Sequence, residues 1–302
     1  MSATIGGQAV LEGVMMRSPR SWAVAVRKPD GELTSVCRPV SSVAGRHAWL
    51  RLPILRGIVA LGESLTIGFR ALAVSANYAA AEDGTDSDAA AELSRGQLIF
   101  AFAVAIGFAL ILFKVSPAII TDQLPVRNTY AFVLVEGAIR VAFLVAYLAL
   151  ISLVPDLRRV FQYHAAEHKA INAYEDGAEL TPERVQTYSL VHLRCGTAFL
   201  LWVMVVAIFV FAFVGRPSLP MLILSRVALL PVIAGIAYEL IRFGSRHPNR
   251  LMRTLMAPGL WLQRLTTREP SLDQVEVSIR ALRSVLDAEQ LASGESRVEV
   301  MA

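Results

Sequence analysis

Three residues that could bind and use a metal ion lie close together in the sequence: His164, Glu167 and His168. Side chains four residues apart on a helix stack on one face about 6 Å apart, so both imidazoles can reach the same ion. Glu167 lies next to that face and could accept a proton from a water molecule whose pKa zinc lowers to about 7. The spacing predicts a divalent metal site, with zinc as the first candidate and Glu167 as the catalytic residue.

These residues form the pattern H-x-x-E-H of inverted zincins, but two histidines do not complete a metal site. His192 and Cys195 follow as H-x-x-C, and we expect them on the next helix, folded back antiparallel to the first. Two completions stay open. In a catalytic site, His164, His168 and one further ligand leave a coordination position free; in a structural site, all four side chains close a tetrahedron. In a third interpretation, the histidines only make hydrogen bonds.

Several acidic residues are candidates for a supporting role. Glu175 would lie about 10.5 Å beyond His168 on an unbroken helix, so we expect it to contact a ligand or a substrate rather than the ion. Glu239, beside Arg242, could face the same site from the end of the last predicted membrane span. Glu12 is a more distant candidate.

The composition indicates a membrane protein. Of the 302 residues, 55% are hydrophobic and only 18% are charged, whereas soluble domains carry about 25% charged residues. The mean hydropathy is +0.51. This composition excludes an ordinary soluble enzyme, a disordered chain and a disulfide scaffold, and the net charge of +4 gives no reason to expect a nucleic-acid partner.

The apolar residues gather into segments long enough to cross a lipid bilayer, which needs about 20 residues. Of the 29 Lys and Arg residues, 24 lie outside the predicted spans and their connecting outer loops. Cytoplasmic loops carry an excess of these residues, so both termini are predicted to be cytoplasmic. The four predicted spans are 97–119, 129–154, 196–214 and 219–241.

A fifth apolar stretch, residues 53–76, is predicted not to span. Arg56, Glu63, Arg70 and Asn77 recur every seven residues and form one polar stripe on a helix. If this helix crossed the bilayer, the later basic segments would lie outside, against the charge distribution. We expect it at the membrane interface or packed against the bundle.

The remaining segments are read from local signals. Alternating residues around Pro29-Asp30-Gly31 predict a β-hairpin. Ser271 and Gln274 form a capping box before an amphipathic helix, which we expect to pack on its own chain; a dimerising coiled coil, and so a homo-oligomer, is the alternative. Glu136 and Arg140 are expected to pair within the second span. The last ten residues are predicted to be disordered.

The predicted fold is mainly α: a polytopic membrane helical bundle with an interfacial amphipathic helix, a small N-terminal β-hairpin region and cytoplasmic helices. The predicted units are a cytoplasmic N-terminal region (1–50), an interfacial helix (51–78), a flexible acidic linker (79–95), membrane helices (96–154), a cytoplasmic helical loop with the His, Glu and Cys residues (155–195), further membrane helices (196–241) and cytoplasmic C-terminal helices with a disordered tail (242–302).

Four sequence blocks resemble the YqhQ-like family of bacterial integral membrane proteins: GGQAVLEGVMMR, YHAAEHKAINAYE, HLRCGTAF and PGLWLQRLTTREP. That family is a domain of unknown function, described as predicted metal-dependent enzymes. The resemblance implies a multi-pass protein of the bacterial inner membrane. One position departs from the family pattern, which has Pro where this chain has Leu193. The residues that the resemblance carries over from these blocks are Gln8, Glu12, Arg17, His164, Glu167, His168, Asn172, Glu175, His192, Arg194, Cys195, Thr266, Thr267, Arg268 and Glu269.

Two functions fit these observations. The first is a cytoplasm-facing metal-dependent hydrolase acting on a peptide, a lipid headgroup or another molecule near the membrane. The second is a non-catalytic scaffold or accessory protein in membrane-protein assembly or secretion, with a structural metal or a hydrogen-bonded histidine cluster. A transporter fits less well, because the sequence has no pair of Gly/Pro-broken spans in corresponding halves.

Overall fold

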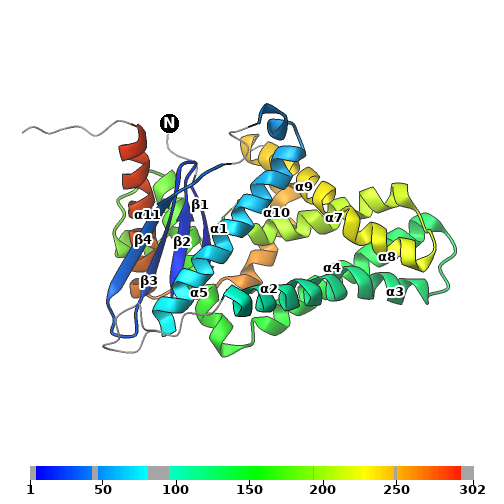
Figure 1. Ribbon diagram of the computed structural model, residues 1–302, viewed down its shortest axis with the longest axis horizontal. Helices are drawn as coiled ribbons and strands as arrows, with labels where there is room; N and C mark the ends of the chain where they lie inside the picture. The colour runs from blue at the N-terminus through cyan, green and yellow to red at the C-terminus, as the bar shows by residue number, and fades with distance from the viewer. Residues whose placement is uncertain (1–4, 43–46, 81–94, 193, 248–249, 294–302) are drawn as a thin grey trace, which may run out of the picture.

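The computed structural model describes residues 5–42, 47–80, 95–192, 194–247 and 250–293. The chain is mostly helical, with one antiparallel sheet near the N-terminus (Figure 1). Most of the predicted acidic linker and of the predicted disordered tail lies outside the described residues. The strands are β1 (Gly6–Val10), β2 (Gly13–Arg17), β3 (Ser21–Arg27) and β4 (Leu33–Pro39). The helices are η2 (Ala48–Arg51), α1 (Leu55–Ala80), α2 (Arg95–Leu110), the π-helical η3 (Ile111–Val115), α3 (Ser116–Asp122), α4 (Thr129–Ile151), α5 (Pro155–Glu175), α6 (Pro182–Gln186), α7 (Gly196–Val214), α8 (Leu219–Ala228), α9 (Leu230–Arg246), α10 (Arg250–Thr266) and α11 (Leu272–Ser293).

The sheet is a meander in the order β1-β2-β3-β4, and both of its faces are covered. Side chains alternate along β3: Ala23 and Ala25 belong to the core shared with α5 and α11, while Trp22 and Val24 belong to the core shared with α1. The predicted hairpin is confirmed as β3–β4, which pair in register with Val24 opposite Val36. The structure adds two further strands to that hairpin.

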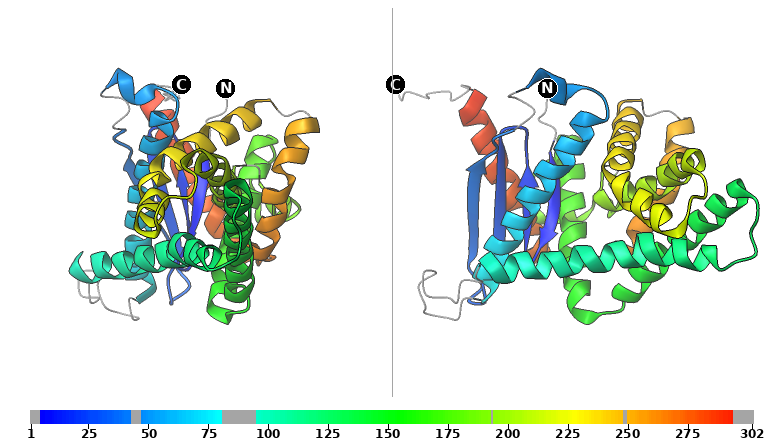
Figure 2. Two further views of the ribbon diagram at one scale, coloured as in Figure 1. Left: turned by 90° about the vertical axis from the view of Figure 1, so that its right-hand side faces the viewer. Right: turned by 45° about the vertical axis from the view of Figure 1, so that its right-hand side comes forward.

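Helix α1 covers one face of the sheet, as the right-hand view of Figure 2 shows, and it also packs against α9. Two members of its polar stripe are paired, because Arg56 binds Glu239 of α9 and Glu63 accepts a hydrogen bond from Arg17 of β2 at 2.9 Å. The helix therefore packs against both the sheet and the bundle. It is also long and apolar enough to cross a membrane over Leu55–Tyr78.

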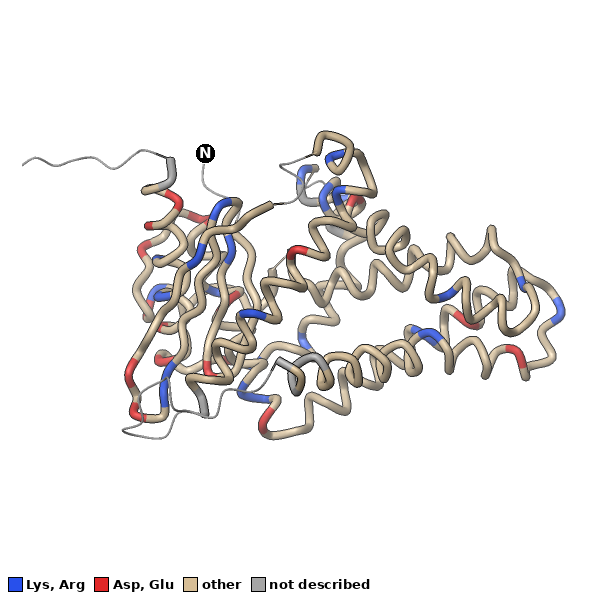
Figure 3. Tube along the Cα trace, viewed as in Figure 1, with Lys and Arg blue, Asp and Glu red and all other residues tan. Residues whose placement is uncertain are grey.

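The apolar helices extend away from the sheet and carry few charged residues (Figure 3). Besides α1, three of the described segments are long and apolar enough to cross a membrane, and they match the first three predicted spans: Phe100–Asp122, Thr129–Ile151 and Gly196–Val214. The fourth predicted span, 219–241, is not one straight helix. It consists of α8 and α9, which meet at an angle of 44°. Pro231 near the start of α9 explains the break, since proline lacks the N–H that a continuous helix would use.

The predicted Glu136–Arg140 pair forms inside the bundle and has a third member. Arg226 of α8 also binds Glu136, with Nη2 2.5 Å from Oε2. These three side chains are at most 1% exposed, and both guanidinium groups lie over the ring of Phe211 at 5.2 and 4.1 Å. This ion cluster ties α4 to α8.

Helix α11 begins with the predicted capping box: the Ser271 amide donates to Oε1 of Gln274 at 3.0 Å, and the Gln274 amide donates to Oγ of Ser271 at 3.4 Å. Val275 and Leu282 are fully buried against the sheet. The helix thus packs on its own chain, as expected. The exception is Leu272, which is 46% exposed at the first position of the helix.

Candidate metal centre

Helix α5 carries the H-x-x-E-H residues and is held between the sheet and the loop that follows α6. Pro155 occupies its first turn, and Gly177 with φ +71° follows its end. Ala166 and Ala170 are fully buried in the core shared with α11, and their small side chains allow close packing. The histidines occupy a different face of α5, toward the start of α7.

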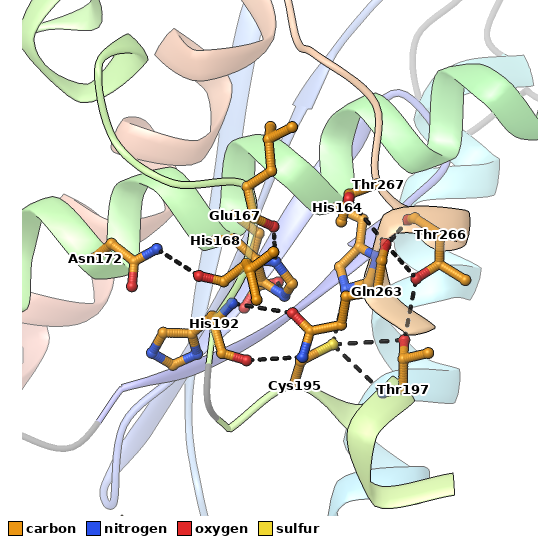
Figure 4. A network of polar contacts seen from close by, with 12 residues as sticks. His164, Glu167, His168, Asn172, His192, Cys195, Thr197, Gln263, Thr266 and Thr267 are labelled. Atoms are coloured by element: carbon orange, nitrogen blue, oxygen red, sulfur yellow. Dashed lines mark hydrogen bonds and ion pairs between the residues drawn. The ribbon is translucent and has the colours of Figure 1, made fainter. Parts of the chain in front are cut away.

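His164, His168 and Cys195 form the cluster of this site (Figure 4). One ligand atom from each lies within 4.8 Å of the others. Nε2 of His164 lies 3.2 Å from Sγ of Cys195, and the two imidazole centroids are 4.4 Å apart. Cys195 is the N-cap of α7 and accepts a hydrogen bond from the Thr197 amide at 3.4 Å, which fixes its sulfur at the end of that helix.

Two backbone carbonyl groups fix the orientation of the imidazoles. Nδ1 of His164 donates to the Thr266 carbonyl at 2.8 Å, and Nδ1 of His168 donates to the Leu190 carbonyl at 2.6 Å. A carbonyl only accepts, so Nδ1 of each ring carries a proton, and Nε2 of the neutral ring is left with the lone pair that a metal can bind. Metal-binding histidines are oriented in this way in most proteins.

The donor set fits a metal ion of the zinc class. Nε2 of His168 is buried and has no hydrogen-bond partner among the described residues, which is costly for a polar atom unless something binds it. Burial also lowers the pKa of His168 and so favours the neutral imidazole that can act as a ligand. Two imidazole nitrogens and one cysteine sulfur are ligands that zinc prefers.

Glu167 lies beside this cluster and is almost completely buried. Its Oε2 is 3.7 Å from Nε2 of His168. Gly7 of β1 packs directly on it, since a Cβ at Gly7 would lie 2.6 Å from both Cγ and Oε1 of Glu167. Burial raises the pKa of Glu167, and the nearby His164 and His192 offset part of that increase. A carboxylate whose pKa is raised is a stronger proton acceptor than a solvated one.

His192 lies next to the cluster but is turned differently. Its ring centroid is 5.9 Å from that of His168, and its Nε2 lies 3.5 Å from Oε2 of Glu175. Gln263 of α10 holds its backbone, with contacts of 3.0 Å to the amide and 2.9 Å to the carbonyl (Figure 4). His192 therefore lies at the edge of the site, where its Nε2 faces the carboxylate of Glu175.

The expected helix bearing His192 and Cys195 is absent from the described residues. Helix α6 ends at Gln186, and the described residues between it and α7, 187–192 and 194–195, form an irregular loop. Side chains of α5 bind backbone carbonyl groups of this loop, which in a helix would accept hydrogen bonds from the backbone. Nζ of Lys169 donates to the carbonyls of Gln186 and Tyr188 at 2.6 and 2.9 Å. Asn172 donates to two further carbonyls of the loop, those of Ser189 and Val191, at 3.0 and 3.1 Å.

Arg194 and Glu175 form an ion pair at the edge of the site, and Arg194 lines its cavity. Glu175 ends α5, which runs unbroken from Pro155, as the spacing argument assumed. Glu239 and Glu12 are engaged elsewhere. Glu239 binds Arg56, and both oxygens of Glu12 accept hydrogen bonds from Arg159.

Motif reasoning did not find four of the contributing groups: Gly7, Lys169, Gln263 and the carbonyl of Leu190. The first two carried weak signals, namely the Gly6-Gly7 pair and a lysine between the motif and Asn172. Gln263 lies within the block PGLWLQRLTTREP, but its contact with the distant His192 backbone has no spacing signal, and the Leu190 carbonyl is a backbone atom that any residue type offers. A cavity of about 460 Å³ lies over the site, lined by residues that include His164, Glu167, His192 and Cys195.

The blocks that build this site also relate the chain to known proteins. A family model described as "Protein of unknown function (DUF1385)" matches residues 52–288. The chain belongs to this family. The uncharacterized protein YqhQ of Bacillus subtilis (strain 168) is 34% identical over 298 residues, which cover 95% of this chain and 93% of that protein. The DUF1385 match includes the cluster and Glu167, whereas Gly7 lies before it. No solved structure matches the chain.

Proposed function

We propose that this protein is a metal-dependent hydrolase of the bacterial inner membrane, with its site at the cytoplasmic surface. The observation that carries the proposal is the cluster of His164, His168 and Cys195, in which the two Nε2 lone pairs and the sulfur face one another. A zinc-class ion held there would supply Lewis acidity for water or for a substrate oxygen.

Glu167 is the proposed general base. Its carboxylate lies next to the cluster and lines the same cavity, and burial, which raises its pKa, makes it a stronger proton acceptor. In the reaction, water adds to an electrophilic carbon or phosphorus, its proton passes to Glu167, and the same proton then goes to the leaving group as the old bond breaks. His192 and Glu175 would orient substrate at the rim.

Three protein ligands favour a catalytic site over a purely structural one. Structural zinc sites have four protein ligands, whereas catalytic sites keep one position for water or substrate. The fourth side chain considered from the sequence, His192, directs its Nε2 to Glu175. Cys195 begins α7, a helix able to cross a membrane, so the site would lie at the bilayer surface.

The distribution of Lys and Arg supports the proposed topology, with multiple spans and both termini in the cytoplasm. The lipid bilayer is then the first partner of the protein, and a membrane-protein or peptide partner is a further proposal.

One observation favours the scaffold role instead. The cluster joins α5 to the start of α7 and, through the Thr266 carbonyl, to the end of α10. A metal at this junction would fasten three helices even without catalysis.

The variant Glu167→Gln separates the two roles. It keeps the shape of the side chain but removes the base, so we expect unchanged metal content and folding and a loss of hydrolysis of about 100-fold or more. The assay measures product release from carboxylate-ester, phosphoester and peptide substrates, with Glu183→Gln, an exposed acid of α6, as the matched control. If Glu167→Gln hydrolyses as fast as the wild type, the hydrolase proposal is wrong.

A further inference from the structure

A second cavity continues from the candidate metal centre. It has a volume of about 630 Å³ and lies between α1, the start of α7 and α9. The residues that line both this cavity and the one over the site are Ala60, Ser64, Arg194, Cys195, Gly196 and Tyr238. Because Cys195 is one of them, a ligand in the second cavity can extend to the cluster. The combined space suits a ligand larger than a single small ion.

The polar part of this second cavity is strongly basic. Arg194, Arg242 and Arg246 line it, and no Asp or Glu is among its described lining residues. Arg242 and Arg246 are four residues apart on α9, so they lie on one face. An arginine in the last turn of a helix is commonly explained by the helix dipole, which accounts for Arg246. Arg194 comes from the loop before α7, pairs with Glu175 and lines the same cavity, so it brings a third guanidinium group to this wall.

The rest of the cavity wall is apolar and continues toward the membrane-spanning helices. Leu61, Phe199 and Ile241 line the cavity. Near them on α7 and α9, Leu200 and Leu240 are 43% and 40% exposed. These helices belong to segments long and apolar enough to cross a membrane, or to form one bent span. The cavity therefore presents guanidinium groups beside a surface suited to acyl chains.

We infer that the two cavities bind an anionic membrane lipid. Its phosphate headgroup contacts Arg194, Arg242 and Arg246, because each guanidinium group can donate two parallel hydrogen bonds to phosphate oxygens. Its acyl chains lie along the apolar faces of α7 and α9, and the headgroup reaches the cluster of His164, His168 and Cys195. This inference rests on the proposed hydrolase function for the lipid's role as substrate, whereas the binding itself depends on the arginines.

The test measures binding to the full chain in neutral maltoside micelles by isothermal titration calorimetry. The probes are dihexanoyl phosphatidic acid, dihexanoyl phosphatidylcholine, inorganic phosphate and a tetraglutamate peptide. The cavity variant is Arg242→Gln with Arg246→Gln. The matched control is Arg158→Gln with Arg264→Gln, two exposed arginines that do not line the cavity. Arg246→Gln alone, at an exposed side chain, replaces the double variant if that one does not fold.

We expect the wild type to bind phosphatidic acid at least about tenfold more tightly than the other probes, and the cavity variant to lose at least about tenfold, since charge-assisted hydrogen bonds are lost. The control variant should bind like the wild type. Equal binding by cavity and control variants overturns the inference. So does inorganic phosphate or the peptide binding as tightly as the lipid, which would assign the cavity to free phosphate compounds or to acidic peptides.

The same measurement on Glu167→Gln separates this inference from the proposed function. Lipid binding should persist in that variant, because the phosphate is bound by the three arginines and not by Glu167. A hydrolase that fails to bind the lipid would refute only the substrate class, and a lipid-binding protein without hydrolysis would refute only the catalytic role.

Discussion

The two cysteines occupy contrasting environments, which makes one a reference for the other. Cys195 is buried, and its sulfur lies 3.2 Å from Nε2 of His164. Cys37 is exposed on β4, the outermost strand of the sheet. A thiolate bound to a metal is protected from alkylation, whereas a free exposed thiol reacts according to its pKa.

We therefore predict that a chelator changes the reactivity of Cys195 only. N-ethylmaleimide should modify Cys195 after zinc removal and leave it largely unmodified before, as measured by peptide mass spectrometry. Cys37 should react in both samples. Because burial raises the pKa of Cys37, its rate at neutral pH should be below that of free cysteine and should increase with pH as the thiolate forms. Equal modification of Cys195 with and without chelator would argue against a metal thiolate.

The two histidines of the cluster show which features of the site the sequence could predict and which it could not. The spacing of His164 and His168 is a local property of a helix, so the sequence could predict that they share a face. Their Nδ1 acceptors are backbone carbonyls, and the one from Thr266 lies 102 residues away. Any residue type offers such a carbonyl, so sequence carries no sign of it. The partner of Glu239 could not be predicted either, because a single acidic residue can pair with any nearby arginine. In the structure it forms an ion pair with Arg56.

The packing of β1 on α5 depends on the close approach of Gly7 to Glu167. Gly7→Ala would place a Cβ 2.6 Å from Glu167, whereas a Cβ at Gly6 has no atom within 4 Å. We expect Gly7→Ala to displace Glu167 and to lower the free energy of unfolding by about 1–3 kcal/mol, as overpacked sites do.

Gly6→Ala is the matched control in the same strand and should leave stability and hydrolysis nearly unchanged. Thermal unfolding and the rate of hydrolysis report the two effects. The close contact is not important if both alanine variants behave alike.

Elements that depend on neighbouring residues could be predicted, and those that depend on distant contacts could not. The α11 capping box and the turn around Gly31, with φ +86°, are local signals. The β1–β2 hairpin was missed because Glu12, with φ +51°, occupies a turn position that favours glycine. The loop before Cys195 is irregular because Lys169 and Asn172 bind its carbonyls, which is a tertiary effect.

For the whole molecule, the ion cluster in the helical bundle is a strong determinant of stability. Glu136 is the carboxylate that binds both Arg140 and Arg226, and all three are buried. We predict that Glu136→Gln lowers the free energy of unfolding by about 3–5 kcal/mol, because two buried guanidinium groups lose their counter-charge.

Glu239→Gln is the comparison, since it breaks a partly exposed pair with Arg56 and should have a much smaller effect. Unfolding in mixed micelles measures both variants. Equal losses would mean that the buried cluster is no more important than a pair at the protein surface.

Composition predicted the arrangement of the molecule better than its details. The apolar segments predicted helices long and apolar enough to cross a membrane, because bilayer thickness sets the length that such a helix needs. The bend between α8 and α9 and the packing of α1 on the sheet depend on tertiary contacts. The sequence of residues 53–76 has the pattern of an amphipathic helix, and that pattern does not indicate whether the helix packs on a sheet or lies at a membrane surface.

The metal content of the purified protein shows whether His164, His168 and Cys195 bind an ion. We predict about one zinc-class ion per chain, measured by inductively coupled plasma mass spectrometry after purification without chelators. His168→Gln and Cys195→Ser should each lose most of that metal. His247→Gln and Cys37→Ser, which change the same residue types outside the cluster, should keep it. A wild-type protein without bound metal, or equal metal in all four variants, would mean that these three residues do not form a metal site.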